Sequence, residues 1–121
     1  MSSEEAAERL WLTTTPHFEG YRIVRYLGVV TGSFQGTPSE KDALRREQGD
    51  SSFGAIMGLP RVDKCRRQAV KSMRENALRL GANAIVGLRF DSLLVPALMG
   101  TFEVVAYGTA VVIELVEQHP E

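Results

Sequence analysis

The segment that decides the fold is RVDKCRRQAVKSMRENALRL, which spans residues 61–80. Its apolar residues recur at steps of three and four, the spacing that places side chains on one face of an α-helix. The members of this stripe are Val62, Cys65, Ala69, Met73, Ala77 and Leu80. Gly81 follows at once, where a helix commonly takes a left-handed cap. The pattern predicts one amphipathic helix over residues 61–80, with Cys65 as a small core residue.

Segments with β-strand character lie on both sides of this helix. Residues 21–30 are dense in β-branched and aromatic side chains, and residues 101–115 carry apolar side chains on both faces. Residues 84–91 alternate between apolar and polar types, which predicts a half-buried strand. The side chains predicted to face inward there are Ala84, Val86, Leu88 and Phe90.

The order of these segments predicts how they are arranged. Residues 10–15 form a short β-prone run that Pro16 closes, which favours an edge strand. A helical crossover and then a hairpin over residues 93–100 would put the last strand between the two earlier ones, antiparallel to both. The predicted fold class is α+β: a β-α-β-β core with a three-stranded antiparallel sheet, one long helix and an extra short N-terminal strand.

Length and composition predict a single domain over residues 1–121. The chain has 121 residues, of which 44% are hydrophobic and 24% charged, as in ordinary globular domains. Residues 1–9 are expected to form a flexible N-terminus. Residues 33–60 are rich in Gly, Pro, Ser and mixed charge, so we expect a long variable connection there.

Several features favour a cytoplasmic protein without a membrane partner. The N-terminus lacks the basic and apolar regions of a secretory signal. The longest apolar stretch, residues 104–113, is far shorter than the roughly 20 residues needed to span a bilayer. Cys65 is the only cysteine, which excludes an intramolecular disulfide framework and favours a reducing compartment.

The apolar strands also predict self-association. A single helix cannot cover both faces of a three-stranded sheet whose strands 21–30 and 101–115 are apolar on both sides. Large exposed apolar patches on soluble proteins usually mark interaction sites. We therefore expect a homo-oligomer. The candidate interface residues are Trp11, Leu12, Leu93, Leu94, Leu98 and Met99.

Four segments together resemble the YbjQ-like family, also labelled heavy-metal-binding domains. They are TTTP at residues 13–16, GYRIVRYLG at 20–28, GANAIVG at 81–87 and AYGTAV at 106–111. The resemblance implies a small β-α-β-β subunit of a ring, typically a pentamer, in bacterial or archaeal cytoplasm, with no established reaction. Residues 33–60 depart from the family pattern, so no role is carried over to them.

The metal label finds little support in the residue types of this chain. The soft or borderline ligands are His17, Cys65 and His119, and none of them stands at a recognised metal spacing. We therefore predict no metal site and no cofactor.

The candidate ligand-binding residues are Arg89, Asp91, Glu103 and Tyr107. All four have odd numbers on strands predicted to face each other, so they could share one polar area. The two carboxylates could act as acid and base or hold a hard cation. A salt bridge from Arg89 at the sheet rim explains the same residues, and we favour it. No catalytic residue is assigned, because no nucleophile with its base can be assembled.

Glycines and basic residues form two further patterns. Gly28, Gly87 and Gly108 interrupt strands, which predicts close approach of the helix or of a neighbouring subunit. The helix at residues 61–80 carries seven basic residues against two acidic ones, whereas the net charge of the whole chain is −1. Binding of a polyanion through this helix is one hypothesis. A solvated helix face that pairs with acidic groups is favoured, and nucleic acid is not an expected partner.

The leading functional hypothesis is a cytoplasmic, homo-oligomeric binding or scaffold module whose main partner is another copy of itself. The first alternative is a protein that binds a small ligand or a metal between subunits. The second alternative is the polyanion-binding protein described above. The residues identify neither an enzymatic reaction nor a particular ligand.

Overall fold

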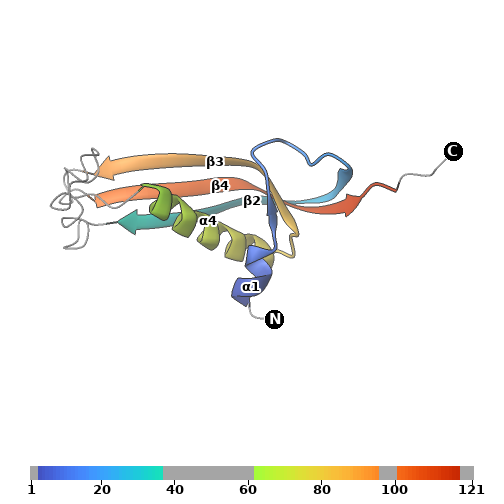
Figure 1. Ribbon diagram of the computed structural model, residues 1–121, viewed down its shortest axis with the longest axis horizontal. Helices are drawn as coiled ribbons and strands as arrows, with labels where there is room; N and C mark the ends of the chain where they lie inside the picture. Colours follow the sequence, from blue (N-terminus) through green and yellow to red (C-terminus); the bar gives the residue numbers. More distant parts are fainter. Residues whose placement is uncertain (1–2, 37–61, 96–100, 118–121) are drawn as a thin grey trace.

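The structure of the protein is a computed structural model that describes residues 3–36, 62–95 and 101–117. Its elements, in chain order, are α1 (Ser3–Glu8), β1 (Trp11–Leu12), β2 (Tyr21–Gly36), α4 (Val62–Arg79), β3 (Ala84–Val95) and β4 (Thr101–Leu115). The strands form one four-stranded sheet in the order β1-β3-β4-β2. Figure 1 shows α4 lying across one face of this sheet, with α1 beside it. The predicted α+β class is confirmed.

The strand β4 lies between β2 and β3 and is antiparallel to both. This is the order that the sequence predicts for these three strands. β1 pairs with β3 in parallel, at Trp11 and Leu12. Backbone hydrogen bonds extend that contact along β3, because the amide of Leu88 donates to Thr13 and the amide of Gly87 donates to Thr15. The predicted N-terminal edge strand is therefore present, but as a strand it covers only Trp11 and Leu12 of the expected residues 10–15.

Other elements also differ in their bounds from the sequence prediction. β2 continues to Gly36, so the connection expected to start at residue 33 begins later. β3 runs to Val95 rather than residue 91, which shortens the hairpin. Both extensions are paired along β4, and this pairing outweighs the low strand propensity of Gly and Ser. Within the N-terminus expected to be flexible, residues Ser3–Glu8 form α1, whose Ala7 is buried.

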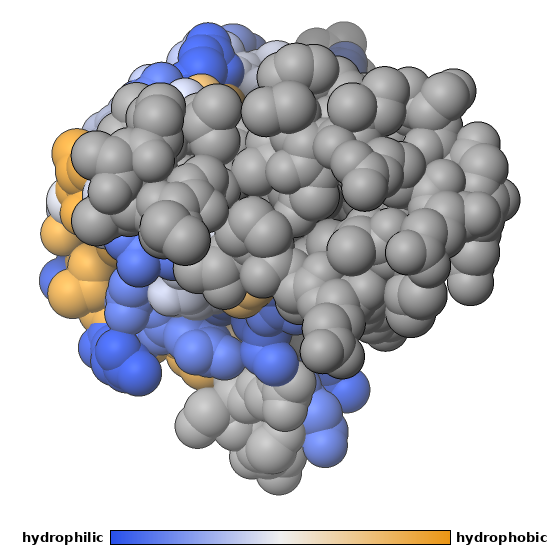
Figure 2. All heavy atoms as spheres, turned by 90° about the vertical axis from the view of Figure 1, so that its left-hand side faces the viewer, coloured by the Kyte–Doolittle hydropathy of each residue, from blue (hydrophilic) through white to orange (hydrophobic). Residues whose placement is uncertain are grey.

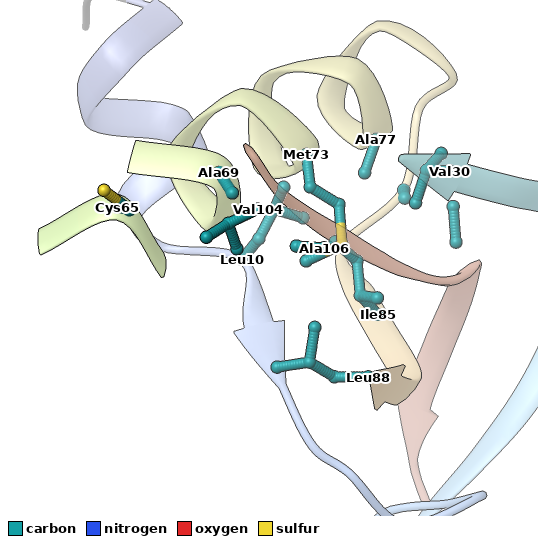
Figure 3. Packing of buried hydrophobic residues seen from close by; sticks show 12 residues of the cluster. Leu10, Val30, Cys65, Ala69, Met73, Ala77, Ile85, Leu88, Val104 and Ala106 are labelled. Atoms are coloured by element: carbon teal, nitrogen blue, oxygen red, sulfur yellow. The ribbon is translucent and has the colours of Figure 1, made fainter. Parts of the chain in front are cut away.

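The main core lies between α4 and the sheet. Cys65, Ala69, Met73 and Ala77 are fully buried, which confirms the predicted stripe and the core role of Cys65. In Figure 3 the Met73 side chain reaches from α4 toward Ala106 and Ile85. Burying a side chain of this size contributes roughly 1.5–3 kcal/mol. Leu80 departs from the prediction: it is 48% exposed, because α4 ends at Arg79.

The closest approach between helix and sheet occurs at Gly32 of β2. A Cβ atom there would overlap the backbone of Ala69 and Met73. Next to it, the Asn76 amide donates to the backbone oxygen of Thr31 at 2.8 Å. At Gly28 and Gly87 a Cβ would meet nothing within 4 Å, so the predicted approach of the helix is wrong there, and approach of a neighbouring subunit stays a prediction. Gly108 does lie close to a neighbour, but that neighbour is β3, since a Cβ there would be 2.7 Å from the Ile85 side chain.

β3 changes its facing at Gly87, which has a φ of 67°. The β3–β4 pairing shifts there, between Val86 and Arg89. Leu88 consequently packs with α4, whereas Ala84 and Val86 pack with Val111 on the opposite face. The prediction that Ala84, Val86, Leu88 and Phe90 share one face is wrong for the first two, because a strict alternation cannot anticipate a bulge.

The far face of the sheet, opposite α4, has a smaller cluster at one end. Phe18, Tyr21 and Ile23 pack there against Ala84, Val86, Val111 and Ile113. Trp11 joins this cluster with ring centroids 5.9 Å from Phe18 and 5.1 Å from Tyr21. The chain between β1 and β2 thus covers part of the face that α4 leaves open.

Candidate functional site

The four predicted ligand-binding residues do share one face of the sheet. Arg89 and Tyr107 are direct partners in the β3–β4 ladder, while Asp91 stands opposite Val105 and Glu103 stands opposite Leu93. The alternation along the two strands places all four on the far face. The guanidinium of Arg89 is exposed, and Tyr107 is half-buried.

Arg89 has a structural partner in this arrangement. Its Nη1 donates to the backbone oxygen of Thr14 at 2.9 Å and to that of Leu88 at 2.8 Å. The neighbouring Thr13 and Thr15 hydroxyls lie 2.6 Å apart, and the Thr15 hydroxyl donates to the backbone oxygen of His17. Arg89 therefore holds the segment after β1 against the bulge in β3. We expected Arg89 to form a salt bridge with Asp91 or Glu103 at the sheet rim. The contacts of its Nη1 are instead with the two backbone oxygens of Thr14 and Leu88.

The described residues do not supply the ligand set of a heavy-metal site. Within residues 3–36, 62–95 and 101–117, no three His, Cys, Asp or Glu side chains gather closely enough to hold an ion. Cys65 lies in the core, His17 is exposed at the surface, and His119 falls outside the described residues. The same part of the chain contains no helix long and apolar enough to cross a membrane.

A basic groove opens between α1, α4 and β3, with a volume of about 640 Å³. Its cationic side chains all come from α4 and are Arg66, Arg67, Lys71 and Arg74. Its apolar lining comes from all three elements and consists of Ala7, Val70 and Phe90. Figure 2 looks at the end of the molecule where α4 begins, and hydrophilic side chains are visible both at its top and in its lower half.

Helix geometry explains why these cations line one groove. Positions 66, 67, 70, 71 and 74 share a side of the helix, because one turn takes 3.6 residues. This side adjoins the buried row of Cys65, Ala69 and Met73. The guanidinium carbon of Arg66 lies 5.3 Å from the centre of the Phe90 ring, a cation–π geometry. Arg67 also pairs with Asp63 at 3.8 Å, with both side chains largely exposed.

The sequence predicted the charge of this helix but not the groove. The basic residues were visible as a local excess, and Phe90 was expected to face inward. The third side of the groove is formed by α1, a helix that we did not predict from the sequence. The sequence signal for α1 is the pair of apolar residues Ala7 and Leu10, both of which are buried.

Exposed apolar side chains follow the outer edge of the sheet. β2 is the edge strand, and on it Tyr26 is 72% exposed and Val29 is 74% exposed. Among the predicted interface residues, Trp11 is 50% exposed and Leu12 is half-buried against the main core. Leu93 and Leu94 belong to β3, but their side chains fall outside the described residues. Leu98 and Met99 lie outside them altogether.

Known proteins resemble this chain in sequence over most of its length. Residues 10–114 match a family model described as "Putative heavy-metal-binding". A UPF0145 protein of Carboxydothermus hydrogenoformans is 36% identical over 85% of this chain and 95% of its own length. Another, from Pyrococcus furiosus, is 33% identical over 88% of this chain and 93% of its own length.

A solved structure agrees with the fold. It is the crystal structure of a DUF74-family protein of unknown function from Pediococcus pentosaceus, with a TM-score of 0.60 and 20% sequence identity. The match covers 87% of this chain and 98% of the other. At this identity the likeness shows the fold alone.

Proposed function

This chain belongs to the YbjQ family of UPF0145 proteins, and on that premise we propose that it is a homo-oligomeric binding or scaffold module that assembles into a ring. The observation that carries the proposal is that β2, a strand of 16 residues, lies at the edge of the sheet with Tyr26 and Val29 exposed. Long apolar edge strands are ready templates for pairing with another chain, and natural proteins usually blunt or cover them.

The end of the β2–β4 pair supports the same proposal. The pairs from Tyr21 with Leu115 to Arg25 with Val112 lie beyond Ala84, where β3 begins, so they form a two-stranded arm. Figure 1 shows this arm projecting past the start of β3. Within the chain the arm is supported by the far-face cluster, which contains Tyr21, Ile23 and Ile113. Its end is exposed at Leu115 and Val116, where a neighbouring copy would cover it.

The position of these surfaces favours a ring over a symmetric dimer. Tyr26 and Val29 lie on the β2 edge, whereas Trp11 lies in β1 at the other edge of the sheet. Contacts between two different surfaces of a subunit are head-to-tail contacts, which form a ring when the rotation between neighbouring subunits closes and an open filament when it does not. A pentamer is the ring size that the family resemblance implies. We place the assembly in the cytoplasm, because the single cysteine is a buried free thiol.

The first prediction concerns the mass of the assembly. Light scattering at micromolar concentration should give a multiple of the 13.4 kDa subunit for the unchanged protein. Val29→Lys puts a charge on the proposed contact, where it would be buried at a high desolvation penalty, so the assembly should fall toward monomers. Leu80→Lys is the matched control, because it adds the same charge at an exposed apolar residue that follows α4 and does not belong to β2.

A monomeric wild-type protein would exclude the proposal. Loss of assembly in Leu80→Lys as well would show that a general increase in charge, rather than the β2 edge, controls the mass.

A further inference from the structure

We propose that neighbouring copies join edge to edge with parallel strands, so that Tyr26 of one copy lies beside Trp11 of the next. This pairing rests on the head-to-tail assembly proposed above, and it identifies the surface that receives β2. That surface is the opposite edge of the sheet in the next copy, which β1 and the free part of β3 form.

The direction of the strands decides how two unlike edges can pair. β2 and β3 are each antiparallel to β4, so they run in the same direction, as the arrowheads in Figure 1 show. A head-to-tail contact repeats one orientation of the subunit from copy to copy. β2 of one copy and β3 of the next therefore lie parallel. A contact between two β2 edges would instead need a two-fold axis and would leave Trp11 of both copies exposed.

Exposed aromatic side chains meet when the sheet continues in this way. One row of consecutive register partners crosses the whole sheet and consists of Trp11, Ala84, Val111 and Tyr26. Ala84 and Val111 belong to the far-face cluster, so the row lies on the far face. Its two ends are exposed, by 50% at Trp11 and by 72% at Tyr26. Continuing the row into the next copy places these two rings side by side, as a cross-strand aromatic pair of the kind that stabilises sheets.

The backbone of both edges is available beyond this row. β2 pairs with β4 without a shift from Val29 to Gly36, since both of its bulges lie before Val29. Among the described residues, the outer side of β3 is paired as far as Leu88 and has no strand beside Arg89–Val95. The two free stretches are of similar length and lie at the same end of the sheet. The oxygen of Thr31 accepts a hydrogen bond from Asn76 and keeps a second lone pair.

The side chains of these stretches are complementary on the far face. Thr31 and Arg89 stand in one row across β4, and Ser33 and Asp91 stand in another. In the continued sheet, Thr31 of one copy lies beside Arg89 of the next, and Ser33 lies beside Asp91. Each pair joins a hydroxyl, which can donate and accept, to a charged group. Arg89 and Asp91, which the sequence analysis singled out for a ligand, thereby belong to a contact between copies.

Disulfide cross-linking of the intact protein tests the contact. Adjacent strands lie about 4.8 Å apart, within the Cα separation of roughly 4.4–6.8 Å that a disulfide needs. Within one chain, Trp11 and Tyr26 are about 14 Å apart across the strands, and Ser33 and Asp91 about 10 Å, so a disulfide of either pair must join two copies. Under mild oxidation, we expect Tyr26→Cys with Trp11→Cys to give a ladder of covalent multimers up to the full ring. Ser33→Cys with Asp91→Cys should do the same and leaves both aromatic residues in place.

Matched controls measure the specificity. Tyr26→Cys with Asp91→Cys uses the same two edges but rows about 20 Å apart along the strands, so it should give no ladder. Tyr26→Cys alone should give no cross-link either. The unchanged protein, whose Cys65 is buried, sets the background.

Three results would overturn the contact and leave the ring in place. They are a cross-link in Tyr26→Cys alone, which indicates two paired β2 edges, equal cross-linking of the off-row pair, and an oligomer in which neither on-row pair cross-links. A monomeric unchanged protein would instead overturn both the ring and the contact. Light scattering of each reduced variant shows whether the assembly is intact before oxidation.

Discussion

At the scale of single residues, the side chain of Asn83 makes the pair of hydrogen bonds that the backbone of a neighbouring strand residue would make. Its side-chain amide donates to the backbone oxygen of Ile113 at 2.9 Å, and its side-chain oxygen accepts from the amide of Ile113 at 2.8 Å. Its own backbone oxygen accepts from the amide of Trp11. Asn83 therefore continues the ladder with β4 just before β3 begins and also holds β1. The sequence GAN, read locally, indicates only a turn before a strand.

A substitution at this residue should reveal that role. Asn83→Asp keeps the shape but removes the amide donor and places a carboxylate against the Ile113 oxygen. We expect the free energy of unfolding to fall by about 1–3 kcal/mol, the penalty for a lost partner of a partly buried polar group. Urea denaturation at one fixed protein concentration measures it, with the surface variant Lys64→Gln as reference. An unchanged midpoint would mean that this pair of hydrogen bonds adds nothing.

Gly32 is the residue at which the sequence was most misleading. Glycine inside a strand is usually destabilising, yet here the missing Cβ lets the backbones of α4 and β2 meet. From the sequence, close approach of the helix or of a neighbouring subunit was expected at Gly28, Gly87 and Gly108 instead. Those positions cannot be told apart from Gly32 by residue type, because the distinction depends on which strand lies under the helix.

Gly32→Ala should destabilise the fold strongly. The added methyl group would overlap backbone atoms of Ala69 and Met73, which cannot move without shifting the helix. We expect a loss of about 3 kcal/mol, at the upper end of overpacked cores. Gly81→Ala is the control, since that glycine has a φ of 88° but open space around it, and it should lose about 1 kcal/mol through backbone strain. Thermal unfolding of both variants compares them, and equal losses would contradict close packing at Gly32.

At the scale of elements, the bulge at Gly87 and the segment after β1 depend on each other. The amides of Gly87 and Leu88 donate to the oxygens of Thr15 and Thr13, and Arg89 adds a hydrogen bond to Thr14. Arg89 was proposed from the sequence as part of a ligand site. Its contacts explain it as an element connector, and neither Asp91 nor Glu103 is needed for that role.

Removing the Arg89 side chain should loosen this connection. In Arg89→Ala, hydrogen exchange at the amides of Gly87 and Leu88 should become about tenfold faster, because the loss of one charge-assisted hydrogen bond makes local opening easier. The main core over α4 should keep its protection. Asp91→Asn, two residues along the same strand, is the control and should leave both rates unchanged. Equal exchange in Arg89→Ala and wild type would return Arg89 to the list of candidate ligand-binding residues.

At the scale of the whole molecule, the basic groove and the aromatic contact proposed between copies belong to opposite faces of the sheet. The groove lies on the side covered by α4, whereas Tyr26 and Trp11 lie in a row on the far face. A substitution in the groove should therefore leave this contact intact. The nearly neutral chain, with a net charge of −1, conceals this uneven distribution of charge.

The sequence by itself determined the elements whose pattern is long and regular. The stripe from Cys65 to Ala77 fixed α4 and its buried face, and the order of segments fixed the α+β class, because both follow from local periodicity and short connections. Only the tertiary structure decided the bulge at Gly87, the contact at Gly32 and the groove between α1, α4 and β3. Each of these features depends on which segment, far away in the sequence, packs next to the residue in question. The local pattern of side chains does not contain that information.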